Sequence, residues 1–310
     1  MTPGQFLLRF YHTPVNRLRD SLRNGGPWQE RRTEAGRRAM EDSARTLPPL
    51  PPAAGQPLEL HLLTGRRFWY QTAFCLWTLA RHTGRPLAPV IYDDGTLTAE
   101  WQAPLASLFP AARFVARAET EARLDQCLPA ARFPILRERW LNYPNIRKLT
   151  DPHLGRTGWK LVLDSDLLFF HRPQFLLAWL AAPDRPLHAV DCETSYGYAR
   201  PLMNRLAGAP VADLVNVGLT GLESAAIDWE QLEHWTRELH AREGTSYYLE
   251  QALIAMMVAG RPCAVAPAAD YVTLPRMPEV HDCRAVMHHY VAHSKRWYFQ
   301  RNWSRAMATP

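Results

Sequence analysis

The sequence predicts an α/β fold, a Rossmann-like and mostly parallel sheet flanked by helices, on three observations. Strand and helix patterns alternate from residue 58 onward. An apolar run at 161–170, interrupted only by Asp-Ser-Asp at 164–166, is typical of a strand buried on both faces. With 310 residues and 47% hydrophobic side chains, the chain is long enough for one large domain with a substantial core.

The alternation is clearest in the first half of the chain. Residues 58–63 and 88–92 form strand patterns, and the helix pattern between them, 68–82, ends near Gly84. A helix at 98–108 and a short strand at 113–116 follow. This order implies right-handed crossovers and a parallel sheet, in which ligands bind beyond the carboxyl ends of the strands.

The second half is less regular but has the same kinds of element. Apolar periodicity predicts the helices 174–181, 229–242 and 247–258. It also predicts the strands 187–190, 214–222 and 262–265.

Residues 1–56 are predicted to form a basic, helical N-terminal extension that ends in a proline-rich linker at 47–52. Short helices are expected at 5–12, from Pro14 onward, and at 27–45. Such basic amphipathic pieces either lie on a membrane surface or dock on the following domain, and their shortness favours docking. The catalytic domain is then expected at 57–298, with a C-terminal tail at 299–310.

Composition limits the classes of ligand and the cellular compartment that we expect for this protein. The formal charge is +6, almost all from arginine, since the chain has only three lysines. A positive balance favours anionic ligands, but no nucleic-acid module is present, so nucleic acid is not expected. The five cysteines have no C-x-x-C spacing, and we see neither a signal-peptide pattern nor an apolar stretch of membrane-spanning length. We therefore expect a cytoplasmic protein, and peripheral contact of the basic N-terminal region with the inner membrane face is the alternative to its docking on the domain.

Two carboxylates, Asp164 and Asp166, flank Ser165, and these three residues form the polar interruption of the apolar run. Two like charges this close repel each other unless a positive charge lies between them. A divalent cation with oxygen ligands satisfies this need, and magnesium or manganese usually brings substrate phosphates with it. The pattern therefore predicts a metal–diphosphate site. The alternative is that both aspartates cap the following turn.

Four further segments carry a family resemblance. Thr64 and Tyr70 lie around the start of the first helix after the first strand, and Arg147-Lys148 precedes the aspartate pair. The last two segments are Val-Asn-Val-Gly-Leu at 215–219 and His-Tyr-Val-Ala-His-Ser-Lys-Arg-Trp at 289–297.

Together with D-x-D, these segments resemble the GT-A class of nucleotide-sugar glycosyltransferases, and most closely glycosyltransferase family 8, the glycogenin-like and bacterial galactosyltransferase-like enzymes. Three positions depart from that family's pattern. Gly65 replaces its first-strand aspartate, Ala292 replaces a glycine, and Arg296 replaces a proline.

The resemblance implies that Asp164, Asp166 and His289 bind one Mn²⁺ (or Mg²⁺) ion that bridges the donor diphosphate. Motif spacing selects His289 over its neighbours. Lys295 is implied to neutralise the leaving nucleoside diphosphate as a point charge.

The resemblance also implies the remaining contacts. Glu250 and Gln251 are implied as a catalytic pair beside the sugar. Alternatively, the negative charge of Glu250 could only stabilise the N-terminus of its helix through the helix dipole. The acceptor site is expected at Asp191, Glu193 and Tyr196. The implied donor contacts are Thr64, Tyr70, Asp94, Arg147, Lys148, Ser165, Asn216 and Gly218. Asp94 could equally belong to an ordinary Asp-Gly turn.

We therefore expect a metal-dependent glycosyltransferase that moves a hexose from a nucleotide diphosphate sugar, a UDP-hexose being favoured, to an acceptor hydroxyl with retention. Inversion would need a base such as Glu193 or Glu250. The acceptor is a glycan, a lipid, a protein or a small molecule. The alternatives are a haloacid-dehalogenase-like phosphatase, whose first aspartate is a nucleophile, a nucleotidyltransferase, and a catalytically inactive GT-A scaffold at a membrane surface.

Overall fold

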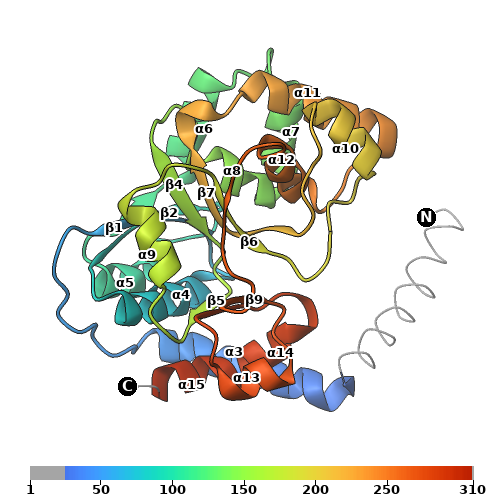
Figure 1. Cartoon of the computed structure of the whole chain (residues 1–310). Coiled ribbons are helices and arrows are strands. Elements are labelled where there is room, and N and C mark those ends of the chain that lie inside the picture. Colours follow the sequence, from blue (N-terminus) through green and yellow to red (C-terminus); the bar gives the residue numbers. More distant parts are fainter. Residues whose placement is uncertain (1–24, 309–310) are drawn as a thin grey trace, which may run out of the picture.

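The structure is a computed structural model that describes residues 25–308, and its centre is a twisted sheet with the strand order β3-β2-β1-β4-β7-β6-β8 (Figure 1). In this sheet β7 runs antiparallel to both of its neighbours, β4 and β6, whereas the other neighbouring pairs are parallel. The strands are β1 (Leu58–Thr64), β2 (Leu87–Asp93), β3 (Arg113–Val115), β4 (Trp159–Leu163), β6 (Leu187–Val190), β7 (Val215–Glu223) and β8 (Ala264–Val265).

Helices cover both faces of this sheet and bury two apolar cores. The first core contains Leu60 and Leu62 of β1 and is covered by α4 (Trp69–Thr83), α5 (Ala99–Leu108) and α9 (Gln174–Ala181). The second contains Val215 and Val217 of β7. The elements around it are α6 (Arg117–Cys127), α7 (Pro134–Asn142), η2 (Pro144–Ile146), α8 (Arg147–Thr150), α10 (Arg200–Ala207), η3 (Ser224–Ala226), α11 (Trp229–Glu243) and α12 (Leu249–Met257). The predicted α/β class with a mostly parallel sheet is therefore confirmed.

The apolar run 161–170 differs from its prediction, because it forms two strands rather than one. β4 ends at Leu163, and β5 (Leu167–Phe169) belongs to a second sheet with the order β5-β10-β9. The partners of β5 in that sheet are β9 (Tyr271–Thr273) and β10 (Met287–His289). The chain leaves the first sheet at Asp164 because carboxylates cannot be buried in a sheet interior without a partner.

The third helical piece of the N-terminal extension docks on the domain. α3 (Gly26–Ala44) buries Met40 and Ala44 completely. Near its start, the Gln300 amide donates hydrogen bonds to the Gln29 carbonyl oxygen (3.2 Å) and to the Thr33 hydroxyl (2.8 Å). The predicted pieces 5–12 and 13–22 lie outside the described residues, and the proposed domain boundaries remain predictions.

The C-terminal elements meet α3 at one end of the molecule. Figure 1 shows α3, α13, α14 and α15 gathered there, below β5 and β9, while α10, α11 and α12 lie at the opposite end. These elements are α13 (Met277–Asp282), η4 (Ala292–Ser294), α14 (Lys295–Trp297), η5 (Tyr298–Asn302) and α15 (Trp303–Ala308). Over residues 25–308, no helix is both long and apolar enough to cross a membrane.

The contact between α3 and η5 is so close that only glycine fits at residue 36. A Cβ atom at Gly36 would overlap the backbone carbonyl group of Phe299. We expect Gly36→Ala to destabilise the protein, because overpacking costs about 1–3 kcal/mol whereas the gain in helix propensity is only about 1 kcal/mol. The Tm in a thermal melt should fall by a few degrees. Arg32→Ala, at an exposed position of the same helix, is the control, and an unchanged Tm for Gly36→Ala would show that the two backbones are not in contact.

Candidate active site

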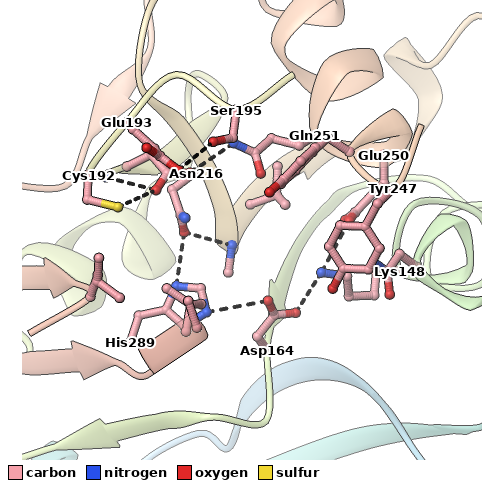
Figure 2. A pocket seen from close by; sticks show the side chains of 18 of the residues that line it. Lys148, Asp164, Cys192, Glu193, Ser195, Asn216, Tyr247, Glu250, Gln251 and His289 are labelled. Atoms are coloured by element: carbon pink, nitrogen blue, oxygen red, sulfur yellow. Dashed lines mark hydrogen bonds and ion pairs between the residues drawn. The ribbon is translucent and has the colours of Figure 1, made fainter. Parts of the chain in front are cut away.

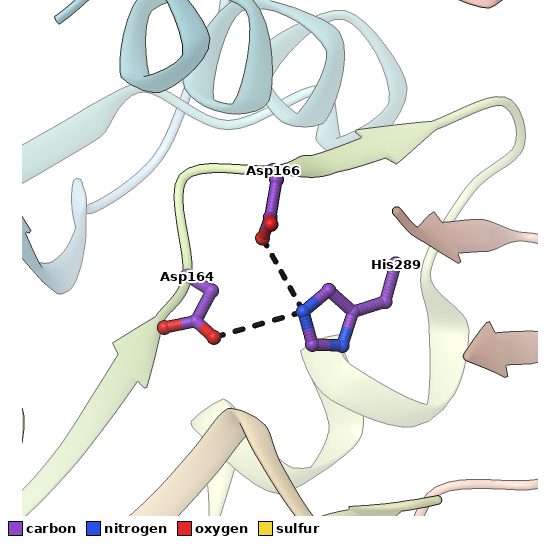
Figure 3. Close-up of side chains that lie close together, drawn as sticks. All are labelled: Asp164, Asp166 and His289. Carbon is purple, nitrogen blue, oxygen red and sulfur yellow. Dashed lines mark ion pairs between the residues drawn. The ribbon is translucent and has the colours of Figure 1, made fainter. Parts of the chain in front are cut away.

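Two aspartates and a histidine meet where the two sheets join. Asp164 follows β4, Asp166 precedes β5, and His289 is the last residue of β10 (Figure 3). One ligand atom from each side chain lies within 4.8 Å of the other two. The sequence-predicted metal ligands are thus brought together by elements of both sheets.

The imidazole of His289 faces the two carboxylates through Nε2. This atom lies 3.3 Å from Asp166 Oδ1 and 3.6 Å from Asp164 Oδ2, and it is buried without a hydrogen-bond partner. The other ring nitrogen, Nδ1, lies 3.2 Å from Asn216 Oδ1, which also accepts the N–H of Gly218 at 3.0 Å. Because Asn216 Oδ1 is an acceptor, Nδ1 carries a proton, and Nε2 is the ring nitrogen left to bind a metal ion or a second proton. The donor set therefore fits a divalent metal ion.

Gly218 of β7 leaves the space that this ring occupies. A Cβ atom at Gly218 would overlap the imidazole of His289. The Gly218 carbonyl oxygen also accepts the N–H of Asp164 at 2.8 Å, which fixes the aspartate beside β7. Gly218 thus places two of the three candidate ligands.

Two lysines balance the charge of the carboxylates. Lys295 Nζ lies 2.8 Å from Asp166 Oδ2, and Lys148 Nζ lies 2.7 Å from Asp164 Oδ1. Burial opposes ionisation of Asp166, but Lys295 and His289 outweigh it and hold the pKa of Asp166 well below its usual range. Burial likewise opposes the charged form of Lys295, yet the charge of Asp166 raises the pKa of this lysine. Asp166 and Lys295 are therefore both charged near neutral pH.

The same charges act on the histidine. Burial lowers the affinity of His289 for a proton, but Asp166 and Asp164 outweigh this effect and raise the pKa of His289. A proton and a metal ion therefore compete for Nε2, and we expect metal affinity to fall as the pH falls.

Glu250 lies on the far side of Lys148 from the candidate ligands. Its Oε2 is 3.2 Å from Lys148 Nζ. Burial raises the pKa of Glu250 to about 7, against the attraction of Lys148. The adjacent Gln251 donates from its amide to Asp191 Oδ2 at 2.9 Å and to the Val215 carbonyl oxygen at 3.0 Å, so its side chain is held in one orientation.

A cavity of about 340 Å³ opens beside these residues. In Figure 2, Asp164 lies between Lys148 and His289, with Glu250 and Gln251 across the cavity. The predicted site residues that line it are Lys148, Asp164, Asp191, Glu193, Asn216, Gly218, Glu250, Gln251 and His289. The volume is within the range of small-molecule sites.

Other predicted residues lie at the edge of this arrangement. Tyr70 and Lys295 line a second cavity, which approaches the aspartates through the ion pair of Lys295 with Asp166. Thr64 ends β1 and accepts a hydrogen bond from the Thr72 hydroxyl at 2.8 Å. Ser165 lies between the two aspartates and is partly exposed.

Asp94 occupies the space that Gly65 leaves open. Any Cβ at Gly65 would overlap the carboxylate of Asp94, which accepts hydrogen bonds from the backbone N–H (2.9 Å) and the hydroxyl (2.5 Å) of Thr96. A carboxylate is therefore present beside the end of β1, although it comes from the residue after β2 rather than from position 65.

Two predicted site residues are held by contacts within the fold. Arg147 donates to the carbonyl oxygens of Trp140 (3.0 Å) and Asp94 (2.8 Å), and its guanidinium centre lies 4.3 Å from the Trp140 ring centre. The hydroxyl of Tyr196 donates to the Ala212 carbonyl oxygen at 2.7 Å and accepts the N–H of Val215 at 3.1 Å. Neither residue lines the first cavity, so a direct contact with substrate remains a prediction.

Sequence reasoning missed several residues of this cavity. Two of them are aromatic, Tyr247 and Tyr248, with exposed fractions of 72% and 39%. Asn145 and Ser195 add polar groups, and Tyr143 adds a third ring. The available signal in the sequence was the pair of neighbouring tyrosines, separated from Glu250-Gln251 by Leu249 alone, because aromatic rings next to implied sugar contacts are candidates for the same site.

Comparison with known proteins places the fold in a class. No protein-family model and no curated protein matches the sequence. Among solved structures, the galactosyltransferase LgtC, in complex with donor and acceptor sugar analogues, is similar with a TM-score of 0.53 and 12% identity over 81% of this chain and 95% of that one. The bifunctional glycosyltransferase WbbM has a TM-score of 0.50 and 10% identity over 84% of this chain and 52% of its own length. Mouse xyloside xylosyltransferase 1 has a TM-score of 0.49 and 13% identity over 75% of this chain and 98% of its own.

The chain therefore has the GT-A fold of glycosyltransferases, as the sequence predicted. Identities this low establish the fold alone. The likeness to family 8 in particular stays a prediction.

The pKa of Glu250 predicts a specific pH dependence of stability. Between its ordinary value of 4.5 and its folded value of about 7, the folded state keeps a proton that the unfolded state has lost. Stability should therefore decrease as the pH rises through this window, by up to about 3 kcal/mol from this group. Glu250→Gln should remove that decrease, and denaturant melts of both proteins without metal at several pH values measure it. Parallel curves for the two proteins would mean that Glu250 titrates normally.

Proposed function

We propose that this protein is a metal-dependent glycosyltransferase that moves a hexose from a nucleotide diphosphate sugar, a UDP-hexose being favoured, to an acceptor hydroxyl. One observation carries this proposal. At the junction of the two sheets of a GT-A fold, an unpaired imidazole nitrogen of His289 faces Asp164 and Asp166, and Lys295 lies directly behind Asp166. This is a site for a dication and an anionic leaving group at the carboxyl end of β4.

The donor atoms favour manganese, with magnesium as the alternative. Imidazole suits manganese better than magnesium, whereas carboxylates suit both. Held by Asp164, Asp166 and His289, such an ion would supply electrostatic stabilisation to a departing diphosphate.

The remaining steps fall to the chain's own residues. The ammonium of Lys295 adds positive charge where the diphosphate leaves, which stabilises the transition state more than the intact donor. Asn216 and the fixed amide of Gln251 offer hydrogen bonds to sugar hydroxyls in the first cavity. Asp191 and Glu193, at the same cavity, are proposed to border the acceptor.

We also propose retention of the anomeric configuration. An inverting enzyme needs a carboxylate that is free to accept the proton of the acceptor. Retention is what the resemblance to glycosyltransferase family 8 implies, whereas Glu193 and Glu250, the latter paired with Lys148 and with its pKa raised to about 7, are the bases that an inverting reaction would use. Proton NMR of the anomeric centre of the product measures this outcome directly.

The alternatives have less support. A haloacid-dehalogenase-like phosphatase needs its first aspartate as a free nucleophile, whereas Asp164 is paired with Lys148 in a GT-A fold. An inactive scaffold has no need for the complete set of Asp164, Asp166, His289 and Lys295. Location at the cytoplasmic face of a membrane remains a proposal that rests on the basic charge of residues 1–46.

A panel of nucleotide sugars with Mn²⁺ tests the proposal. Thermal shift identifies the donor that binds, because a ligand of the folded state raises the Tm by mass action. Release of the nucleoside diphosphate is then compared with hydrolysis of p-nitrophenyl phosphate. Phosphate release in the second assay, with no response to any nucleotide sugar, would favour the phosphatase, and inactivity in both assays would favour the scaffold.

Asp166→Ala should reduce metal-dependent turnover by about 100-fold or more, because it removes a proposed metal ligand and the partner of Lys295. The measurements are diphosphate release and Mn²⁺ affinity, with circular dichroism to check that the fold is intact. Asp184→Ala, which changes an aspartate paired only with its neighbour Arg185, is the control. Full activity of Asp166→Ala would refute the metal assignment.

Lys295→Ala should lower kcat more than it weakens donor binding, because the lysine is proposed to act on charge that develops as the diphosphate leaves. Steady-state kinetics and donor titration separate the two effects. Lys160→Ala is a matched control, since Lys160 lies near the start of β4, is paired with Glu59 and lines neither cavity. An equal loss in both quantities would mean that Lys295 only holds the ground-state donor.

A further inference from the structure

A second cavity, of about 560 Å³, lies between α3 and the start of α4. It reaches the candidate metal site through Lys295, whose Nζ is 2.8 Å from Asp166. The first cavity is lined by Asp164 and His289, and His289 lies 3.3 Å from Asp166 on that residue's other carboxylate oxygen. A diphosphate held at this cluster would therefore lie close to residues of both cavity walls, Asp164 of the first and Lys295 of the second.

The second cavity has the chemistry of a nucleotide site. Arg66, Arg67 and Lys295 bring positive charge, and the ring of Phe68 is 39% exposed at the cavity wall. Cationic groups pair with phosphate oxygens, and an exposed aromatic ring offers a face on which a base can stack.

An unsatisfied amide in the same wall gives independent support. Gln71 is 2% exposed, and its Nε2 donates to the Tyr70 hydroxyl at 3.3 Å. Its Oε1 is buried and has no hydrogen-bond partner. A buried acceptor without a partner costs free energy, and the N–H group of a base could satisfy it.

The opposite wall of the cavity comes from the N-terminal extension. Arg37 of α3 points into it, with Nε 2.8 Å from Glu34 Oε2 and Nη1 2.8 Å from Glu41 Oε2. Its guanidinium centre lies 5.9 Å from the ring centre of Tyr70. Two carboxylates thus hold the guanidinium in place, so that little side-chain entropy remains to be lost when an anion binds.

We propose that α3 is one wall of the nucleoside diphosphate site and that Arg37 is a donor-binding residue. This inference rests on the proposed function and names a part of that same site which the resemblance does not assign. The nucleotide would lie between the Arg37 side of α3 and the Phe68–Gln71 turn of α4, with its phosphates directed toward Lys295. Glu34 and Glu41 would lie within reach of the ribose hydroxyls, from which carboxylate oxygens readily accept hydrogen bonds.

Calorimetric titration with UDP and with GDP, each in the presence of MnCl₂, tests this proposal on the full chain. With whichever diphosphate binds the wild type more tightly, Arg37→Ala should weaken binding by about tenfold or more, because a charged hydrogen-bond partner of the nucleotide is lost. Mn²⁺ affinity, titrated alone, should not change. Arg37→Lys should recover part of the loss, and Arg32→Ala, on the exposed side of α3, should bind as the wild type does.

Hydrogen exchange of the wild type gives a second readout that does not depend on a variant. The diphosphate with Mn²⁺ should slow amide exchange in α3 together with the first turns of α4. Unchanged or faster exchange in α3 would overturn the proposal. It would mean that the helix does not contact the nucleotide, or that it moves away when the nucleotide binds. Binding by Arg37→Ala within about twofold of the wild type would overturn it as well.

The two proposals fail in different ways. If the wild type binds neither diphosphate with Mn²⁺, the proposed function fails and this inference falls with it. If the wild type binds a diphosphate and Asp166→Ala does not, while Arg37→Ala binds normally, the proposed function stands and the role of α3 is refuted.

Discussion

The repulsion between Asp164 and Asp166 is the constraint around which the rest of the molecule is arranged. Two carboxylates that flank one residue, both largely shielded from water, are stable only when cations surround them. In this fold Lys148 lies beside Asp164, Lys295 lies beside Asp166, and the imidazole of His289 lies between the two carboxylates. Each of these partners comes from a different part of the chain. The ion pairs of the two aspartates therefore connect the large sheet, the small sheet and the C-terminal helices at one site.

The two cavities near this point differ in the chemistry of their linings. The cavity lined by Asn216, Gln251 and Asp191 offers hydrogen-bonding groups that are already fixed by partners within the protein. The second cavity is rich in arginine and aromatic rings. Polar, directional groups suit a sugar, whereas diffuse positive charge and flat rings suit a nucleotide. A donor that contains both, joined by a diphosphate, matches this division.

The sequence predicted what is encoded locally or by motif spacing. Strands such as β1 and β6 have enough residues for an apolar pattern, and the spacing from His289 to Lys295 carried the resemblance. It did not predict the small sheet, because β9 and β10 have only three residues each and show no periodicity. It also gave no sign that β7 runs antiparallel, since a buried strand has the same composition in either direction. The pairing of Lys148 with Glu250 and the position of Arg37 depend on contacts between distant segments, which no local pattern encodes.

The position of His289 has a consequence for the order in which the site is assembled. Asp164 and Asp166 are synthesised well before His289. Phe299 and Gln300, which pack against α3, are synthesised later still. An N-terminal part of the chain can fold during synthesis, but it then holds two acidic groups without the imidazole and without Lys295. A nascent or prematurely terminated chain that ends before Lys295 consequently lacks groups that surround the two aspartates in the complete fold, so the proposed metal and donor site would form only after this residue has been synthesised.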